Sequence, residues 1–178
     1  IVGRNCLEGI YIKAPKIIME KVKILFIKPY VHSHNDLIDI PLGILSLSAY
    51  LKQHIDEKIE AQCLDLRLTR DAEKFLNLRL INFMPDIIGI SMLSFEKDFL
   101  PQYFHKIKAI APQAKTIIGG PYATYCYDEI LSDYPVDYVV IGEGERTLLN
   151  LVRTYIKGGE SQGLKGIAYR NEGGVQCN

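Results

Sequence analysis

The sequence predicts an α/β fold with a doubly wound, flavodoxin-like (Rossmann-like) five-stranded parallel sheet in a three-layer αβα arrangement. Two observations support this fold class. Short apolar runs alternate with longer amphipathic segments five times between residues 22 and 160, which is the pattern of βαβ units. Four of the five apolar runs are nearly continuous in Val, Ile, Leu and Tyr, as expected for strands buried on both faces.

The elements follow in order along the chain. Strands are expected at residues 22–28, 61–66, 87–93, 115–119 and 136–141, and helices at 41–55, 70–83, 97–110, 123–132 and 146–157. In the first helix Ile44, Leu47, Leu51 and Ile55 recur at helical spacing, and Pro41 suits its first turn. Residues 164–170 are expected to form an extra strand whose partner, beyond the turn at Gly173 and Gly174, is missing.

Composition limits the classes of partner. The chain has 178 residues, 48% of them hydrophobic, and its 21 basic and 21 acidic residues balance to zero net charge. It therefore has enough apolar material for one domain and no basic surface that would predict binding to nucleic acid or to a membrane. The four cysteines lie far apart, which favours a reducing, cytoplasmic location.

The domain organisation expected from these patterns has three parts. Residues 1–21 are an unassigned N-terminal appendage, residues 22–160 form the α/β domain, and residues 161–178 begin a linker toward further structure. Because the sequence opens on Ile1 and stops just after a turn, we expect it to be a piece of a longer protein.

The loops that follow the strands are the candidate binding site, because ligands of such folds lie at the carboxyl ends of the strands. Ser91 and Ser94 follow the third strand, where they either bind a ligand or cap the next helix. The glycines 119 and 120 end the fourth strand, where they either admit a flat ligand or serve a tight turn. The first loop, residues 29–40, contains His32, His34, Asp36 and Asp39, but histidines at this spacing are more often solvated, so no metal ligand or catalytic residue is assigned.

The segment Gly142-Glu143-Gly144-Glu145 follows the fifth strand. It is not a dinucleotide fingerprint, because the third glycine would fall on Thr147 and the motif does not follow the first strand. Its two carboxylates suit ribose hydroxyls or the N-terminus of the next helix better than a pyrophosphate.

Taken together, residues 22–170 resemble the N-terminal cobalamin (B12)-binding domain of B12-dependent radical SAM enzymes. The resemblance lies in Pro41-Leu42-Gly43, in residues 86–91, 117–124 and 136–145, and in the 166–170 segment. It implies that cobalamin is bound by the loop residues at the strand ends: Ile40, Pro41, Leu42, Gly43, Ser91, Met92, Leu93, Ser94, Gly119, Gly120, Pro121, Tyr122, Gly142, Glu143, Gly144 and Glu145.

The sequence departs from other B12 domains at one motif. The domains of methionine synthase and methylmalonyl-CoA mutase carry DxHxxG, SxL and GG; Ser91-x-Leu93 matches the second and Gly119-Gly120 the third. If Gly43 is the DxHxxG glycine, Ile38 and Ile40 take the Asp and His positions. The resemblance thus implies base-off cobalamin without a histidine below the cobalt, shielded from water by Ile40, Leu42 and Met92, with His34 the nearest other candidate ligand.

The resemblance also implies a partner. Radical SAM enzymes hold a 4Fe-4S cluster with CxxxCxxC, which this sequence lacks, so the cluster and SAM are expected in a downstream domain of a parent methyltransferase or cyclase. Two alternatives stay open. One is a degenerate domain that binds no cobalamin and serves for docking. The other is a flavodoxin-like FMN carrier, disfavoured because the first loop lacks a phosphate cradle. If Gly120 faces the ligand, Gly120→Val should abolish cobalamin uptake.

Overall fold

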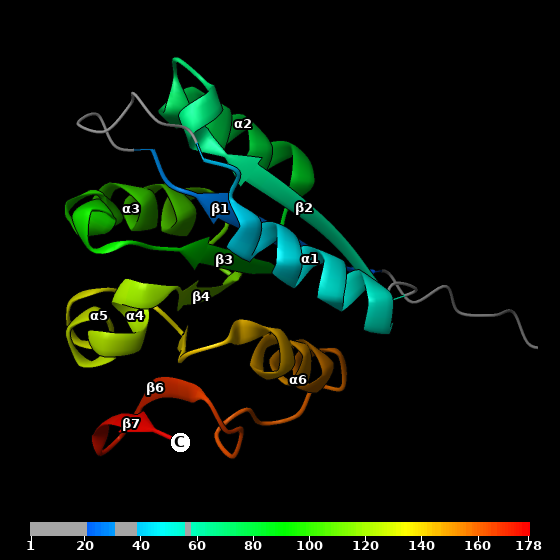
Figure 1. The fold of residues 1–178 in the computed structure, drawn as a ribbon, viewed down its shortest axis with the longest axis vertical. Helices are drawn as coiled ribbons and strands as arrows, with labels where there is room; N and C mark the ends of the chain where they lie inside the picture. The colour runs from blue at the N-terminus through cyan, green and yellow to red at the C-terminus, as the bar shows by residue number, and fades with distance from the viewer. Residues whose placement is uncertain (1–20, 31–38, 56–57) are drawn as a thin grey trace, which may run out of the picture.

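The computed structural model describes residues 21–30, 39–55 and 58–178, which are built around a sheet in the order β2-β1-β3-β4-β5-β6-β7 (Figure 1). Its first five strands are parallel: β1 (Val22–Lys28), β2 (Ile59–Asp65), β3 (Ile87–Ser91), β4 (Lys115–Gly119) and β5 (Tyr138–Val140). Strand order reverses between β1 and β3, which is the topological switch point of a doubly wound fold. The predicted fold class and its parallel strands are confirmed.

Helices cover both faces of this sheet, as the continuous apolar strands predict. One face packs against α1 (Leu42–Ile55) and α6 (Gly144–Ile156), and the other against α2 (Ala72–Phe83), α3 (Leu100–Ile110), α4 (Pro121–Tyr125) and α5 (Tyr127–Asp133). Two short 3-10 turns, η2 (Leu66–Leu68) and η3 (Ser94–Phe99), precede α2 and α3. The predicted helix at 123–132 is in fact two short helices that meet at Cys126.

The end of the chain differs from the sequence-based expectation. The strand β6 (Ile167–Asn171) pairs antiparallel with β5, and β7 (Gly174–Cys177) pairs antiparallel with β6. The expectation of a missing partner strand was therefore wrong, because the four residues after the turn are that partner and extend the sheet to seven strands. A strand so short, with only Val175 partly covered, carries too little apolar pattern to predict.

Within the described ranges, none of the helices combines the length and the apolar character that a membrane-spanning segment requires.

Two aspartates fasten the amino edge of the sheet, the edge opposite the predicted binding loops. Asp86 accepts a hydrogen bond from the Lys23 amide at 2.7 Å, which ties the start of β3 to β1. Asp137 accepts from the Thr116 amide at 2.8 Å, from the Thr116 hydroxyl at 2.9 Å and from Lys115 Nζ at 2.9 Å, which ties the start of β5 to β4. Burial raises the pKa of the Asp137 carboxyl, but these hydrogen bonds outweigh burial and lower the pKa below its ordinary value.

We predict that Asp137→Asn destabilises the domain by about 1–2 kcal/mol at pH 7, because the carboxylate loses its charge-assisted bonds. A carboxyl with a lowered pKa in the folded state stabilises the fold above the pKa of the unfolded chain, and this contribution disappears as the pH falls through the folded pKa. Urea unfolding of both proteins should therefore show a stability difference at pH 7 that begins to shrink at about pH 4, the ordinary pKa of an aspartate, and is lost as the pH falls through the lowered pKa of the folded state. A difference independent of pH would contradict the assigned role of the charge.

Candidate functional site

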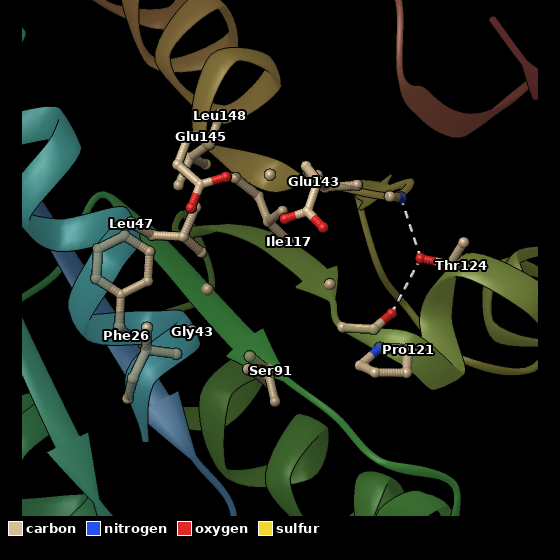
Figure 2. Close-up of a pocket in the computed structure, with 18 of the residues that line it drawn as sticks. Phe26, Gly43, Leu47, Ser91, Ile117, Pro121, Thr124, Glu143, Glu145 and Leu148 are labelled. Atoms are coloured by element: carbon tan, nitrogen blue, oxygen red, sulfur yellow. Dashed lines mark hydrogen bonds between the residues drawn. The ribbon is translucent and has the colours of Figure 1, made fainter. Parts of the chain in front are cut away.

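A cavity of about 380 Å³ opens at the carboxyl edge of the parallel strands, on the face covered by α1 and α6. Figure 2 shows Phe26 and Leu47 on one side of it, Pro121 and Thr124 on the opposite side, and Ile117 between them. The cavity thus spans β1, β3, β4 and β5 at the edge where this fold class binds ligands.

The cavity exists because the last residues of β3 and β4 are small on one face of the sheet only. On the side of α1 and α6 these strands end in Gly89, Ser91 and Gly119, all of which line the cavity. Their neighbours in sequence point to the opposite face and are buried isoleucines: Ile88, Ile90 and Ile118. Alternation along the strands therefore places full packing under α2 and α3 and a hollow floor under α1 and α6.

Two glycines allow close packing in the walls of the cavity. A Cβ at Gly89 would lie 2.9 Å from Phe26 Cδ1, so the glycine lets the Phe26 ring rest directly on β3. A Cβ at Gly144 would lie 3.1 Å from Leu47 Cδ2, so α6 packs against α1 at its first residue. Both helices therefore meet each other above the floor without filling it.

Polar groups gather at the mouth. The Ser46 hydroxyl donates to Glu145 Oε1 at 2.9 Å and joins α1 to α6. The Thr124 hydroxyl donates to the Gly120 carbonyl at 3.1 Å and accepts from the Gly142 amide at 3.0 Å, joining the loops after β4 and β5 (Figure 2). Among the described residues no side-chain hydrogen bond engages the Ser91 hydroxyl, which leaves it available to a ligand.

A buried ion pair supports the neighbouring loop. Lys28 Nζ, at the end of β1, donates to Glu96 Oε1 at 2.6 Å, and the Leu93 amide donates to Glu96 Oε2 at 2.7 Å. Both side chains of the pair are buried, Glu96 with 2% of its surface exposed. The carboxylate therefore holds the loop after β3 against the end of β1.

Gly119 and Gly120 differ in the space that a side chain would have. A Cβ at Gly119 would make an ordinary 3.9 Å contact with Val140 Cβ, on the cavity side of the sheet. A Cβ at Gly120 would lie 2.6 Å from the Met92 carbonyl oxygen, and its φ of +102° is in the region that favours glycine. Of the two explanations that the sequence left open, the structure supports the conformational one at Gly120. A side chain there would strike the Met92 backbone before any ligand, so loss of uptake in Gly120→Val would not show that the glycine faces a ligand.

Nine of the residues expected from the sequence line the cavity: Gly43, Ser91, Gly119, Gly120, Pro121, Gly142, Glu143, Gly144 and Glu145. The other seven lie outside its lining. Ile40 and Leu42 are each 70% exposed beside the cavity at the start of α1, where Pro41 separates them, and Leu93 and Ser94 are exposed on the next loop. Met92 and Tyr122 are buried, with their side chains in the core cluster on the other face of the sheet.

Several lining residues were not expected from the sequence: Phe26, Leu47, Gly89, Ile117, Thr124 and Leu148. Five of them lie within the expected strands and helices, whereas the candidates were taken from the loops after the strands; Thr124 follows the fourth strand but was not among the candidates. A glycine within an isoleucine-rich strand, as at Gly89, was the available signal, since an interior strand glycine often marks a close approach. His32, His34, Asp36 and Ile38 lie outside the described residues, and the described part of the chain holds no group of three metal-ligating side chains.

Comparison with known proteins supplies the family. A family model described as "B12 binding domain" matches residues 36–152. The chain is 30% identical over 158 residues to the anaerobic magnesium-protoporphyrin IX monomethyl ester cyclase of Rubrivivax gelatinosus, covering 83% of this chain and 28% of that protein. It is 29% identical over 164 residues to an uncharacterised methyltransferase of Pyrococcus horikoshii, covering 89% of this chain and 35% of that protein.

Solved structures share the fold. The radical S-adenosylmethionine methyltransferase TsrM of Kitasatospora setae, solved with cobalamin and a 4Fe-4S cluster, superposes with a TM-score of 0.74 at 21% identity over 88% of this chain and 28% of that one. The cobalamin-dependent S-adenosylmethionine radical enzyme OxsB, solved with aqua-cobalamin, gives 0.76 at 22% identity over 89% of this chain and 22% of that one. This chain thus spans between 22% and 35% of the length of these relatives.

We predict that Gly120→Ala destabilises the domain by about 1–3 kcal/mol, because its Cβ meets the Met92 backbone and the backbone conformation is strained for alanine. Gly119→Ala is the matched control and should change stability by less than about 1 kcal/mol. Urea unfolding of both variants provides the measurement, and equal stabilities would refute the contact.

Proposed function

The chain belongs to the B12-binding domain family, and from that membership we propose that residues 22–160 hold cobalamin with its nucleotide base displaced from cobalt and inserted between α1 and α6. The sequence resemblance to the cobalamin domains of radical SAM enzymes is confirmed at the level of the family. One observation supports the placement of the base: the floor is made of the small residues Gly89, Ser91 and Gly119, and a cavity remains above it in an otherwise packed domain.

The size of the cavity fits the nucleotide base of cobalamin. About 380 Å³ is too small for a corrin ring with its amide side chains, but it suits a flat aromatic base with part of its ribose. The corrin would then lie over the carboxyl edge, where the apolar side chains of Ile40, Leu42 and Tyr125 are exposed. Among the described residues no lysine or arginine lines the cavity, which favours an aromatic base over the phosphate of a flavin nucleotide.

The polar groups at the mouth suit the rest of the nucleotide. Glu143 and Glu145 stand where the ribose would leave the slot, and their carboxylates accept hydrogen bonds from hydroxyls. The Ser91 hydroxyl reaches the floor, where it can bond the ring nitrogen that the base frees when it leaves the metal. Ile40, at the position of the axial histidine in other B12 domains, offers the cobalt no ligand, so this domain would keep the lower face apolar.

When bound, cobalamin supplies a cobalt centre that carries a methyl group between a donor and an acceptor. We propose that the parent protein is a B12-dependent radical SAM methyltransferase or cyclase whose further domain, with SAM and a 4Fe-4S cluster, covers the carboxyl edge. The exposed Leu68 and Phe95 extend the apolar surface there, beyond the reach of the cavity.

A cytoplasmic location accords with Cys63, Cys126 and Cys177, which are free thiols.

The direct test is to mix the purified protein with hydroxocobalamin, remove free ligand by gel filtration and record the visible spectrum at pH 7. We expect the pigment to stay with the protein and to show a base-off spectrum, whereas free cobalamin at this pH keeps its base on the cobalt. A base-on spectrum would contradict the slot, and a histidine-ligated spectrum would contradict the apolar lower face. A folded protein that retains no pigment would favour a docking domain without cofactor.

We predict that Gly119→Val weakens cobalamin binding about tenfold or more, because its branched methyl groups enter the slot while its backbone conformation tolerates a side chain. The matched control is Gly163→Val, an exposed glycine with open space around its Cβ, which should bind as the wild type does. Titration followed by ultrafiltration gives the affinities, and thermal melting checks that both variants fold. Equal affinities of the two variants for cobalamin would contradict the placement of the base on this floor.

A further inference from the structure

We propose that the cavity selects the cobamide by its lower base, accepting an apolar benzimidazole or phenol and discriminating against a purine. This inference rests on the proposed function and adds the chemical class of the ligand.

The buried part of the cavity is apolar. Phe26, Ile117, Val140 and Leu148 line it, and each exposes no more than 5% of its surface. The carboxylates and the Thr124 hydroxyl lie at the mouth, where the hydrogen bonds to Ser46 and Gly142 already engage Glu145 and Thr124. A base that enters beyond the mouth therefore meets carbon on its sides.

The backbone of the floor at Gly89 is occupied by the sheet. Gly89 is paired in register with Phe26 on one side and with Ile117 on the other, so the strand amides and carbonyls beneath the base serve the sheet ladder. The Ser91 hydroxyl remains as the polar group of the floor. It can satisfy one ring nitrogen.

One polar group on the floor is enough for a benzimidazole or a phenol but not for a purine. A displaced benzimidazole presents a single free ring nitrogen, and a phenol presents only the oxygen through which it is attached. An adenine adds further ring nitrogens and an exocyclic amine. Each buried polar group left without a partner costs about 1–3 kcal/mol, which corresponds to about 5- to 150-fold in affinity for one such group.

The test compares four ligands on the same protein: cobalamin, the p-cresolyl cobamide, the adeninyl cobamide, and cobinamide, which lacks the nucleotide. The cresolyl and adeninyl ligands are the decisive pair, because the phenol never binds cobalt and adenine binds it weakly, so little affinity is lost in displacing either base. We expect the adeninyl cobamide to bind at least tenfold more weakly than the cresolyl form, by ultrafiltration at pH 7.

Equal or tighter binding of the adeninyl cobamide would overturn the selectivity while leaving cobalamin binding intact. Equal binding of cobinamide and the cresolyl cobamide would overturn it too, since the base would then not enter the slot. If none of the four binds to the folded protein, the proposed function itself fails, which is a different result.

A substitution in the wall of the cavity tests whether this wall causes the selectivity. Val140→Thr replaces a methyl group with a hydroxyl of nearly the same size beside the slot and should reduce the cresolyl-to-adeninyl affinity ratio at least threefold. Val175→Thr makes the same change on β7, away from the cavity, and should leave the ratio unchanged. A ratio unchanged in a folded Val140→Thr would overturn the assignment of the base to this wall.

Discussion

The small residues at the carboxyl ends of β3 and β4, on the face covered by α1 and α6, are the constraint on which the site depends. Gly89, Ser91 and Gly119 remove the volume that the isoleucines of the opposite face provide. Because α1 and α6 contact each other through Leu47 and Gly144, they bridge this floor and cannot sink into it. A cavity maintained in this way costs packing energy in the empty protein, which favours occupation by a ligand of matching shape.

The two edges of the sheet are organised for opposite purposes. At the amino edge, Asp86 and Asp137 accept hydrogen bonds from the amides of neighbouring strands and thereby hold the starts of these strands together. At the carboxyl edge, the buried pair of Lys28 and Glu96 fixes a loop instead of a strand. Burying two charges is costly, and the hydrogen bond from Leu93 shows what the pair achieves: a loop held in one position beside an open site.

The sequence predicted the parallel strands, the helices and nine lining residues because these depend on local patterns: apolar runs, helical spacing and glycines after strands. It did not predict the cavity floor, since the role of Gly89 appears only when β1 places Phe26 against it. For Gly120 the sequence left two explanations open, a bound ligand or a tight turn, and it could not decide between them because the Met92 backbone that excludes a side chain belongs to a different loop. β7 was missed because a short, exposed strand is defined by its partner more than by its own residues.

The hydrogen bond between Ser46 and Glu145 joins residues 99 positions apart in the sequence. One wall of the cavity is thus made early during synthesis and the other only after nearly the whole domain has left the ribosome. Contacts of such separation form late, since the chain between them must first be ordered. A nascent chain therefore has no binding site to offer until α6 has docked, and a ligand that bridges both walls would hold the first and last helices of the domain together, slowing the opening that exposes it to proteases.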